Sequence, residues 1–330
     1  MQIVLNDFGL FLGKKGNRFI IKNKDSKKEF VMDKVDQIVI AAGSSISISA
    51  IKYALQKNID IVFLSNYGKP LGRIFPCKLG GTTLTRKKQL EAYYTNKGVD
   101  IAKKLIGAKI ANQGYLLRSL SKTRDIDFKP VANELIILSK KVMCNIKGDI
   151  ETIRENILGL EGLAASKYFS CLSKILPFDN RDKKSNDQVN ILLNYSYGIL
   201  YNEIEKVCIL AGLDPYFGFL HKDRYNKPSM VLDLIEEFRP VLVDKVIITL
   251  FVQKQIKEDF FEIDQETKQL ILTKKGRDKI ISVIIDRLDN KVHFKNKRLS
   301  FKDILLSQAR DMANSFLDES KEFEPFVYKW

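Results

Sequence analysis

Residues 85–120 read "TRKKQLEAYYTNKGVDIAKKLIGAKIANQGYLLRSL", and apolar side chains recur along them at helical spacing. Leu90, Ile101 and Leu105 belong to stripes of apolar residues like those on the buried face of an amphipathic helix. Gly98 interrupts the pattern and predicts a bend or a break, because glycine weakens a helix interior. The stretch therefore predicts the beginning of a helical body.

The residues before this stretch alternate at the strand period instead. Short segments rich in β-branched and aromatic residues are separated by polar turns, and in the turn "KKGN" (14–17) Gly16 is available for a positive φ. One segment, 45–58, has helical spacing. We predict a β-rich, sandwich-like domain over residues 1–78, followed by the linker "KLGGTTL" (78–84). The expected strands cover residues 2–6, 9–13, 18–23, 28–32, 37–42, 60–65 and 70–75.

The residues after the opening stretch are typical of a helical domain. Helical patterns continue towards the C-terminus, interrupted by a strand-like hairpin, "FEID…QLILT", between residues 261 and 273. The predicted fold class is α+β, with the β-rich N-terminal domain followed by a larger all-α domain over residues 79–330 that holds the candidate catalytic residues. The further expected helices cover residues 130–145, 148–170, 187–211, 228–238, 277–289 and 301–320.

The charge of the chain restricts its partners. Lysine and arginine outnumber aspartate and glutamate by 55 to 40, a formal net charge of +15. This excess favours nucleic acid or an anionic membrane surface. No apolar run approaches the roughly 18 residues of a membrane-spanning helix, and we find no secretory signal pattern. The cysteines form no CxxC pair and predict reduced core residues of a cytoplasmic protein rather than a zinc site; they are Cys77, Cys144, Cys171 and Cys208.

Glu161 is a candidate for chemistry because its sequence neighbours are small and apolar. It lies between Leu160 and Gly162 in "IRENILGLEGLAASKYFS" (153–170). A carboxylate buried there without a partner would be costly or would have a raised pKa, and a metal ion is one partner that relieves this. A glutamate on a helix surface, beside glycines that allow close helix packing, fits the same sequence. The local sequence leaves both interpretations open.

His221 is one of only two histidines and stands in "GFLHKDRYNKPSMVLDLIEEFRP" (218–240). A lone histidine is commonly a packing residue, so the segment that follows it decides whether it is a ligand. Pro228 suits the first turn of a helix, and Pro240 would end that helix. The sequence thus predicts a histidine directly ahead of a short helix.

Three carboxylates lie on that predicted helix. Asp233 is three residues before Glu236 and four before Glu237, so all three would share one face and repel one another. A divalent cation or a cluster of basic residues would relieve the repulsion, and a solvated network of ion pairs remains open as well. One imidazole and two or three carboxylates form an oxygen-rich site suited to Mg²⁺ or Mn²⁺. Such a site supports phosphoryl chemistry on nucleic acid.

Three separated blocks resemble one known family. "LEGLAASKYF" (160–169), "NDQVNILLNYSYGILYNEIEKVCILAGLDPYFGFLH" (186–221) and "SMVLDLIEEFRP" (229–240) are similar to signature blocks of the CRISPR-associated integrase and endonuclease family that acquires new spacers. "RKKQL…AKIANQ" (86–113) resembles an earlier block of that family. The resemblance implies a metal-dependent transesterification, in which a 3′-hydroxyl of a short DNA duplex attacks the repeat–leader phosphodiester. It also implies nicking of branched DNA.

The resemblance assigns roles to residues of this chain. The metal ligands and catalytic residues would be Glu161, His221 and Glu236, and Asp233 would sit beside the site as an auxiliary acid. The second histidine, His293, matches no ligand position. The residues that would line the DNA path, brace the site or hold phosphates are Arg181, Asn190, Tyr197, Lys222, Arg224 and Arg239.

The resemblance further implies partners: DNA, a second copy of the chain in a homodimer, and a small ferredoxin-like CRISPR-associated nuclease. Other functions stay open. They are a transposon-borne integrase that inserts its own ends, a catalytically idle scaffold that binds branched DNA by charge, and a basic helical protein with ion-paired carboxylates. A complete ligand set argues against the scaffold. The aromatic tail "FEPFVYKW" (323–330) is expected to dock on a neighbour or to become ordered on partner binding.

Overall fold

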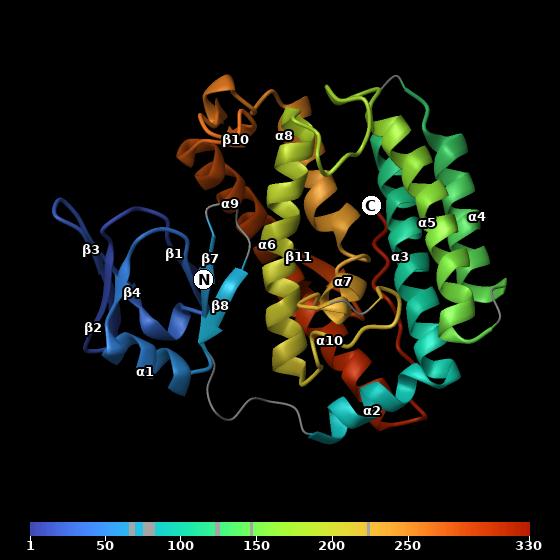
Figure 1. Cartoon of the computed structure of the whole chain (residues 1–330), viewed down its shortest axis with the longest axis horizontal. Helices are drawn as coiled ribbons and strands as arrows, with labels where there is room; N and C mark the ends of the chain where they lie inside the picture. Colours follow the sequence, from blue (N-terminus) through green and yellow to red (C-terminus); the bar gives the residue numbers. More distant parts are fainter. Residues whose placement is uncertain (66–69, 75–82, 123–125, 146–147, 223–224) are drawn as a thin grey trace. The chain divides into compact units, whose positions relative to one another are not determined.

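The structure is a computed structural model, and it describes residues 1–65, 70–74, 83–122, 126–145, 148–222 and 225–330. The chain divides into two compact units, Met1–Leu79 and Gly80–Trp330. The first is rich in strands and the second is mostly helical, which confirms the predicted fold class (Figure 1). Residues 78–82 of the predicted linker and Cys77 lie outside the described residues.

In its described residues, the N-terminal unit consists of two four-stranded sheets and one α-helix. One sheet has the order β1-β5-β7-β8, in which only β8 is antiparallel to its neighbour, and the other has the order β4-β3-β2-β6. The elements are β1 (Gln2–Leu5), β2 (Phe11–Lys15), β3 (Arg18–Lys22), β4 (Lys27–Val31), a 3₁₀ turn (Met32–Lys34), β5 (Gln37–Ile40), β6 (Ser45–Ile46), α1 (Ile48–Gln56), β7 (Asp60–Leu64) and β8 (Pro70–Ile74).

A single hydrophobic core joins these sheets and α1. Leu12 of β2, Ile38 of β5 and Ala54 of α1 are fully buried in it, because alternate strand residues point to one face. The β2–β3 turn is formed as predicted, with Gly16 at a φ of +55°. The unit is therefore built by the period-two pattern read from the sequence.

The helical unit surrounds a long central helix, α3 (Asn96–Ser121). Its other elements are α2 (Thr83–Tyr93), α4 (Lys129–Asn145), α5 (Ile150–Leu172), α6 (Gln188–Ala211), α7 (Ser229–Leu234), a π-helical segment (Arg239–Asp244), α8 (Lys245–Val252), a 3₁₀ turn (Glu258–Phe260), β9 (Phe261–Ile263), β10 (Leu270–Leu272), α9 (Lys274–Asp289), β11 (Lys291–Phe294), β12 (Lys297–Ser300) and α10 (Phe301–Leu317).

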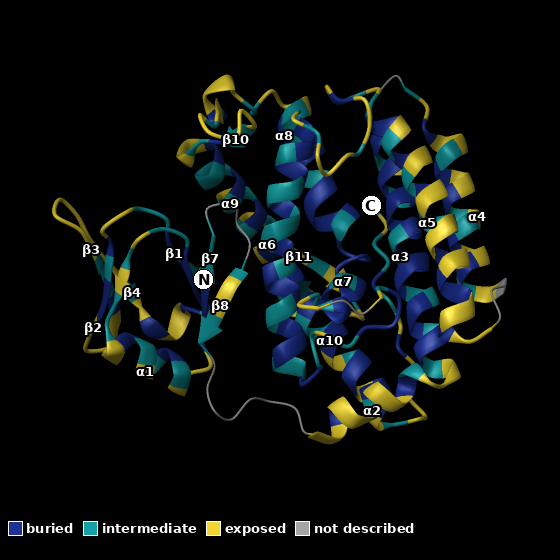
Figure 2. Cartoon of the chain, in the orientation of Figure 1, coloured by how far each residue is buried: buried dark blue, intermediate teal, exposed yellow. Residues whose placement is uncertain are grey.

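The central helix is buried along most of its length, whereas α4 and α5 expose their outer faces (Figure 2). Gly107 and Gly114 allow α4 to approach closely, since a Cβ at either position would meet atoms of α4 at 2.5 and 2.9 Å. A helix buried on nearly all sides presents any polar residue it carries to the protein interior. This is how α3 supplies polar groups to the site.

The helical unit departs from the predicted pattern in three places. The break in the opening stretch falls at residues 94–95, ahead of Gly98, which lies in the first turn of α3. The helix expected over 228–238 is α-helical only to Leu234, and Pro240 stands near the start of a π-helical segment rather than ending a helix. Two short hairpins interrupt the helices, and only β9–β10 was predicted.

The C-terminal tail folds back on its own unit, so the prediction that it docks on a neighbour is wrong. Phe323 and Phe326 are 2% and 1% exposed within the main core. The Phe326 ring stacks on Phe238 at a centroid distance of 5.2 Å and meets Phe301 edge-on. The tail thereby reaches the segment that carries Glu236.

The predicted cysteine and membrane properties are tested in part. Cys171 and Cys208 are buried free thiols, whereas Cys144 is exposed. His293 is an exposed residue of β11. In the described part of the chain, no helix is long and apolar enough to cross a membrane.

Candidate metal and DNA site

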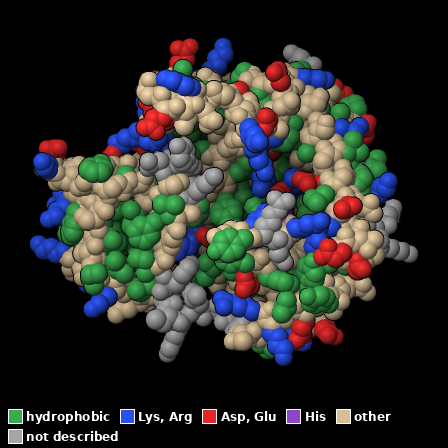
Figure 3. Space-filling model, viewed as in Figure 1, with side chains coloured by type: hydrophobic (Ala, Val, Ile, Leu, Met, Phe, Trp, Pro, Cys, Tyr) green, Lys and Arg blue, Asp and Glu red, His purple; other side chains and the backbone are tan. Residues whose placement is uncertain are grey.

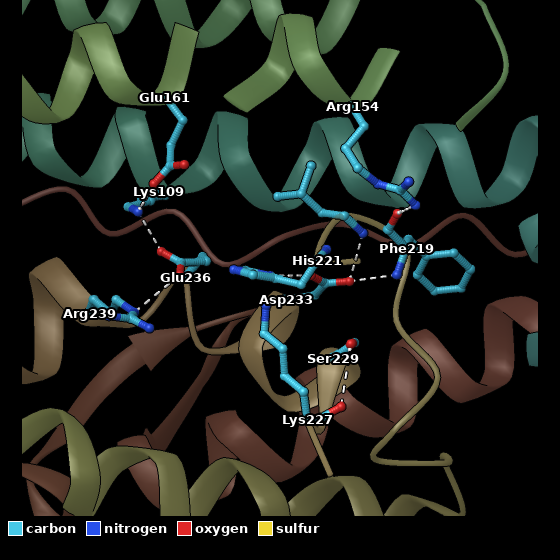
Figure 4. Close-up of polar contacts among 11 residues, drawn as sticks. Lys109, Arg154, Glu161, Phe219, His221, Lys227, Ser229, Asp233, Glu236 and Arg239 are labelled. Carbon is cyan, nitrogen blue, oxygen red and sulfur yellow. Dashed lines mark hydrogen bonds and ion pairs between the residues drawn. The ribbon is translucent and has the colours of Figure 1, made fainter. Parts of the chain in front are cut away.

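Two glutamates from different elements converge on one lysine in the interior of the helical unit (Figure 4). Lys109 projects from α3, Glu161 from α5, and Glu236 from the turn after α7. The Lys109 ammonium is hydrogen-bonded to Glu161 and lies 2.5 Å from Glu236 Oε2. Arg239 Nε lies 3.2 Å from Glu236 Oε1, so Glu236 faces two cations. We refer to these four residues as the cation cluster.

Burial and charge compete within the cation cluster. Burial by itself raises the pKa of the Glu236 carboxyl, but the charges of Arg239 and Lys109 outweigh it and hold the pKa at about 2. Burial likewise disfavours the charged form of Lys109, yet Glu236 and Glu161 raise its pKa above the ordinary value. Both partners are therefore ionised at neutral pH.

His221 is held by a different arrangement. Asp233, fully buried on α7, accepts backbone N–H groups from Phe219, Leu220 and His221 at 2.6, 2.9 and 3.0 Å. Its Oδ1 also lies 2.6 Å from the His221 Nδ1. Because a carboxylate only accepts, Nδ1 carries the proton, and in the neutral ring Nε2 keeps a free lone pair. Figure 4 shows the imidazole extending from Asp233 toward Glu236.

The loop that carries His221 is fixed by two further contacts. A Cβ at Gly218 would lie 2.6 Å from the Ser229 carbonyl carbon and 2.7 Å from Asp233 Oδ2, so only glycine fits there. The buried Arg154 of α5 donates to the Phe219 carbonyl at 3.3 Å. These contacts set the place of the imidazole relative to α5 and α7.

The three carboxylates expected on one helix face point to three different partners. Asp233 binds the His221 loop, Glu236 faces the cation cluster, and Glu237 Oε2 accepts the Phe326 N–H of the tail at 2.7 Å. The α-helix ends at Leu234, so Glu236 and Glu237 lie in the turn that follows it. Mutual repulsion of the three side chains is therefore not what organises this segment.

Arg239 is braced by a buried aromatic network. Its guanidinium lies over the Tyr197 ring at 4.7 Å, and Arg181 lies over the same ring at 5.6 Å. The Tyr197 hydroxyl donates to Asp244 Oδ1 at 2.5 Å, and the Tyr168 hydroxyl donates to Oδ2 at 2.9 Å. Tyr197 thus holds Arg239 in place beside Glu236.

The other residues predicted to contact DNA fall into two groups. Asn190 is fully buried, and its side-chain oxygen accepts from Arg181 Nη1 at 2.7 Å, a bracing position. Lys222 is exposed beside His221, and Arg224 lies outside the described residues. Figure 3 shows a hollow on the visible face of the helical unit between α6 and α3, with Lys and Arg side chains at its edge. Contact of these residues with DNA stays a prediction.

The predicted ligands Glu161, His221 and Glu236 lie in one region, but in this conformation they do not form a ligand cage. Among the described residues, no group of three or more His, Cys, Asp or Glu side chains is arranged to hold a metal ion. Instead the Lys109 ammonium stands where the two glutamates meet. A cation at that point, with carboxylate and imidazole donors around it, fits the donor chemistry of Mg²⁺ or Mn²⁺.

Glu161 has a partner that neither interpretation of its local sequence named, and the sequence contained a signal for it. Glu161 is paired with Lys109 and its side chain is 23% exposed, while Cβ atoms at Gly159 and Gly162 would meet no neighbour. Lys109 stands in "IGAKIANQG" (106–114), a run of small and apolar residues of a buried helix. A lysine in such a run needs a buried anion.

Sequence comparison agrees with the resemblance. Residues 3–285 match the family model described as CRISPR associated protein Cas1. The chain is 34% identical over 351 aligned positions to a CRISPR-associated endonuclease Cas1 of Archaeoglobus fulgidus, covering 100% of both proteins.

Structural comparison extends this match. A casposase bound to its integration product shares 27% identity and a TM-score of 0.84, covering 99% of this chain and 94% of that one. A Cas6-RT-Cas1–Cas2 complex has the same fold, with a TM-score of 0.76 and 21% identity over 100% of this chain and 36% of that chain. These matches place the protein in the class of DNA endonucleases and integrases. Within that class, the chain belongs to the Cas1 family of CRISPR-associated proteins.

Proposed function

We propose that this protein inserts short DNA duplexes into a CRISPR array, in a metal-dependent reaction in which a 3′-hydroxyl attacks a phosphodiester. The observation that supports this most is the convergence of Glu161 and Glu236 on a single cation position that the His221 imidazole faces. A bound Mg²⁺ or Mn²⁺ would polarise the phosphodiester and stabilise charge on the attacking and leaving oxygens.

The residues of the chain prepare that chemistry. Glu161, His221 and Glu236 would hold the metal. Asp233 keeps the His221 proton on Nδ1, so that Nε2 is available as a metal ligand. Asp233 thus acts through His221, as a positioning residue. Glu236 is 4% exposed, which limits how far bulk water screens its charge.

Basic side chains beside the site would bind phosphates. Lys222 is exposed next to His221, and Arg239 is held over Tyr197 with its Nε on Glu236. Removal of a phosphate contact should weaken DNA binding to all sequences and flatten its salt dependence. For Asn190 and Tyr197 we propose bracing rather than DNA contact, because both side chains bind protein groups.

We propose a homodimer bridged by a small CRISPR-associated partner as the working form. One structural neighbour is a complex that joins Cas1 with Cas2, which supports a partner of this kind. The Cas1 endonuclease match over the whole chain supports the CRISPR role. The casposase match supports a second candidate, a transposon-borne integrase.

Strand transfer tests the proposal. A labelled duplex with 3′-hydroxyl ends is mixed with a supercoiled plasmid carrying a CRISPR leader and repeat, in Mn²⁺ or in EDTA. Joining should require Mn²⁺ and be lost in Glu161→Ala and His221→Ala, but persist in Glu155→Ala, which removes an exposed carboxylate from the same helix.

The other candidates give different results in the same assay. Joining of duplexes of unrelated sequence favours the CRISPR role, whereas joining restricted to one terminal sequence favours the transposon-borne role. Tight, salt-sensitive DNA binding without joining, even with the partner added, would indicate a catalytically idle scaffold.

A further inference from the structure

We propose that Lys109 is a built-in counter-ion of the metal site, which occupies the cation position in the metal-free protein and must be displaced when a divalent ion binds. This inference rests on the proposed function, because it concerns how the same site is loaded. It assigns a role to a residue that the predicted ligand set does not include.

The geometry of Lys109 supports this role. Its ammonium contacts Glu161 and Glu236 together, and its side chain is only 11% exposed. The two glutamates belong to elements far apart in sequence, and the ammonium bridges their carboxylates. A divalent ion held by both carboxylates would need the space and the lone pairs that the ammonium now uses.

The charges of the cation cluster support displacement rather than shared occupancy. Two carboxylates, Glu161 and Glu236, face two cations, Lys109 and Arg239. A divalent ion that entered with both cations in place would leave an uncompensated excess of positive charge in a buried site. Withdrawal of one of the two cations reduces this excess.

Lys109, rather than Arg239, is the group free to withdraw. Arg239 is held by its stacking on Tyr197, which is itself fixed by Asp244. Lys109 contacts the two carboxylates, and its ammonium is a point charge on a flexible four-carbon chain. A rotamer change of that chain clears the cation position without moving α3.

Metal affinity tests the proposal directly. Mn²⁺ binding is measured by titration calorimetry and by the Mn²⁺ electron paramagnetic resonance signal in wild type and in Lys109→Met, which keeps an unbranched side chain, shorter by one atom, and removes the charge. The variant should bind Mn²⁺ at least about tenfold more tightly, because the internal competitor is gone. In EDTA the same variant should melt at a lower temperature than wild type, because Glu161 and Glu236 lose their shared cation.

Two control variants separate the effect of a cation at the Lys109 position from the effect of the net charge of the protein. Lys109→Arg keeps a cation at the position and should bind Mn²⁺ close to wild type. Lys104→Met removes one positive charge from the same helix, where Lys104 pairs with Asp100, and should also resemble wild type. Equal or weaker Mn²⁺ binding by Lys109→Met would overturn the counter-ion role. Absence of Mn²⁺ binding in wild type and in all variants would overturn the metal centre itself.

A second measurement needs no variant. Acylation of lysines by a small amine reagent is followed by mass spectrometry in wild type, with and without Mn²⁺. Displacement predicts that Lys109 is modified several times faster with Mn²⁺, while Lys104 is modified at an unchanged rate. An unchanged Lys109 rate at a Mn²⁺ concentration that calorimetry shows to be saturating would contradict displacement.

Discussion

Asp233 and Glu236 are three residues apart, both are buried, and their partners differ in kind. Asp233 accepts three backbone N–H groups and the His221 Nδ1 proton, so its partners are fixed parts of the chain. Glu236 faces the side chains of Lys109 and Arg239. A carboxylate that accepts backbone N–H groups fixes a loop. A carboxylate paired with a lysine ammonium on a flexible side chain can exchange that ammonium for a metal ion.

The comparison explains why only one of these carboxylates is suited to bind a metal. Metal binding to Asp233 would leave several buried N–H groups without an acceptor, at a cost of about 1–3 kcal/mol each. Metal binding to Glu236 replaces one cation with another. Variants on the Asp233 side and on the Glu236 side should therefore lose stability through different contacts.

The first variant disturbs the Glu236 side through the tail. Phe326→Ala removes a ring that is 1% exposed and loosens the segment whose N–H reaches Glu237. Unfolding in urea should show a loss of about 3–5 kcal/mol, the usual cost of emptying a buried aromatic site. Tyr225→Ala, at a residue 96% exposed, should leave the unfolding curve nearly unchanged. A loss below about 1 kcal/mol for Phe326→Ala would mean that the tail is not part of the core.

The second variant removes the anchor of the His221 side. Asp233→Ala leaves the N–H groups of the loop without their acceptor and should cost about 2–4 kcal/mol in urea unfolding. The matched control is Asp264→Ala, since Asp264 also accepts backbone N–H groups but in an exposed turn. Its effect should be much smaller. Equal losses of unfolding free energy in the two variants would show that the burial of Asp233 does not strengthen its contribution to stability.

The third variant tests the close contact of the loop with α7. Gly218→Ala introduces a Cβ against the backbone of Ser229 and should cost about 1–3 kcal/mol, with reduced Mn²⁺ affinity because the imidazole shifts. Gly159→Ala adds the same methyl group where no atom lies within 4 Å, inside α5. That control should gain up to about 1 kcal/mol from helix propensity. Similar melting temperatures for the two variants would contradict the contact.

A third buried carboxylate, Asp244, accepts hydrogen bonds from the neutral hydroxyls of Tyr197 and Tyr168. Burial raises its pKa above the ordinary 3.8, although hydrogen bonds from Tyr197 and Tyr168 act against this. The folded state therefore holds the proton more tightly, and this contribution to stability is complete below pH 3.8 and is lost as the pH rises through the raised pKa.

Asp244→Asn removes that titration. The free energy of unfolding should fall less with rising pH in the variant than in wild type, by about 1.4 kcal/mol for each unit of pKa shift. Urea unfolding at several pH values between 3 and 8 measures the difference. Parallel curves for the two proteins would mean that the pKa of Asp244 is the same in the folded and the unfolded state.

Local patterns predicted most of the fold. The Gly16 hairpin and the helices α4, α5 and α6 follow from periods and turn residues within short windows. Helix ends were less predictable: α7 stops at Leu234, and Glu236 and Glu237 beyond it reach separate partners, which no local pattern encodes.

The candidate site was predictable where family blocks contained it. Asp233 and His221 are 12 residues apart and their proximity was expected. Lys109 and Glu161 are 52 residues apart, and Asn112, which donates to the Phe326 carbonyl, is 214 residues from it. Such contacts depend on how α3 packs, so periodicity and spacing do not predict them. A lysine in a buried helix and an aromatic tail both indicate that a contact partner exists within the protein. They do not indicate which residue that partner is.

Anomalous diffraction from crystals soaked in Mn²⁺ would locate the metal itself. One Mn²⁺ peak should lie about 2.0–2.3 Å from oxygens of Glu161 and Glu236 and from the His221 Nε2, with the Lys109 ammonium moved away. A peak elsewhere, or none, with Lys109 still between the two glutamates, would contradict the metal centre and its proposed loading.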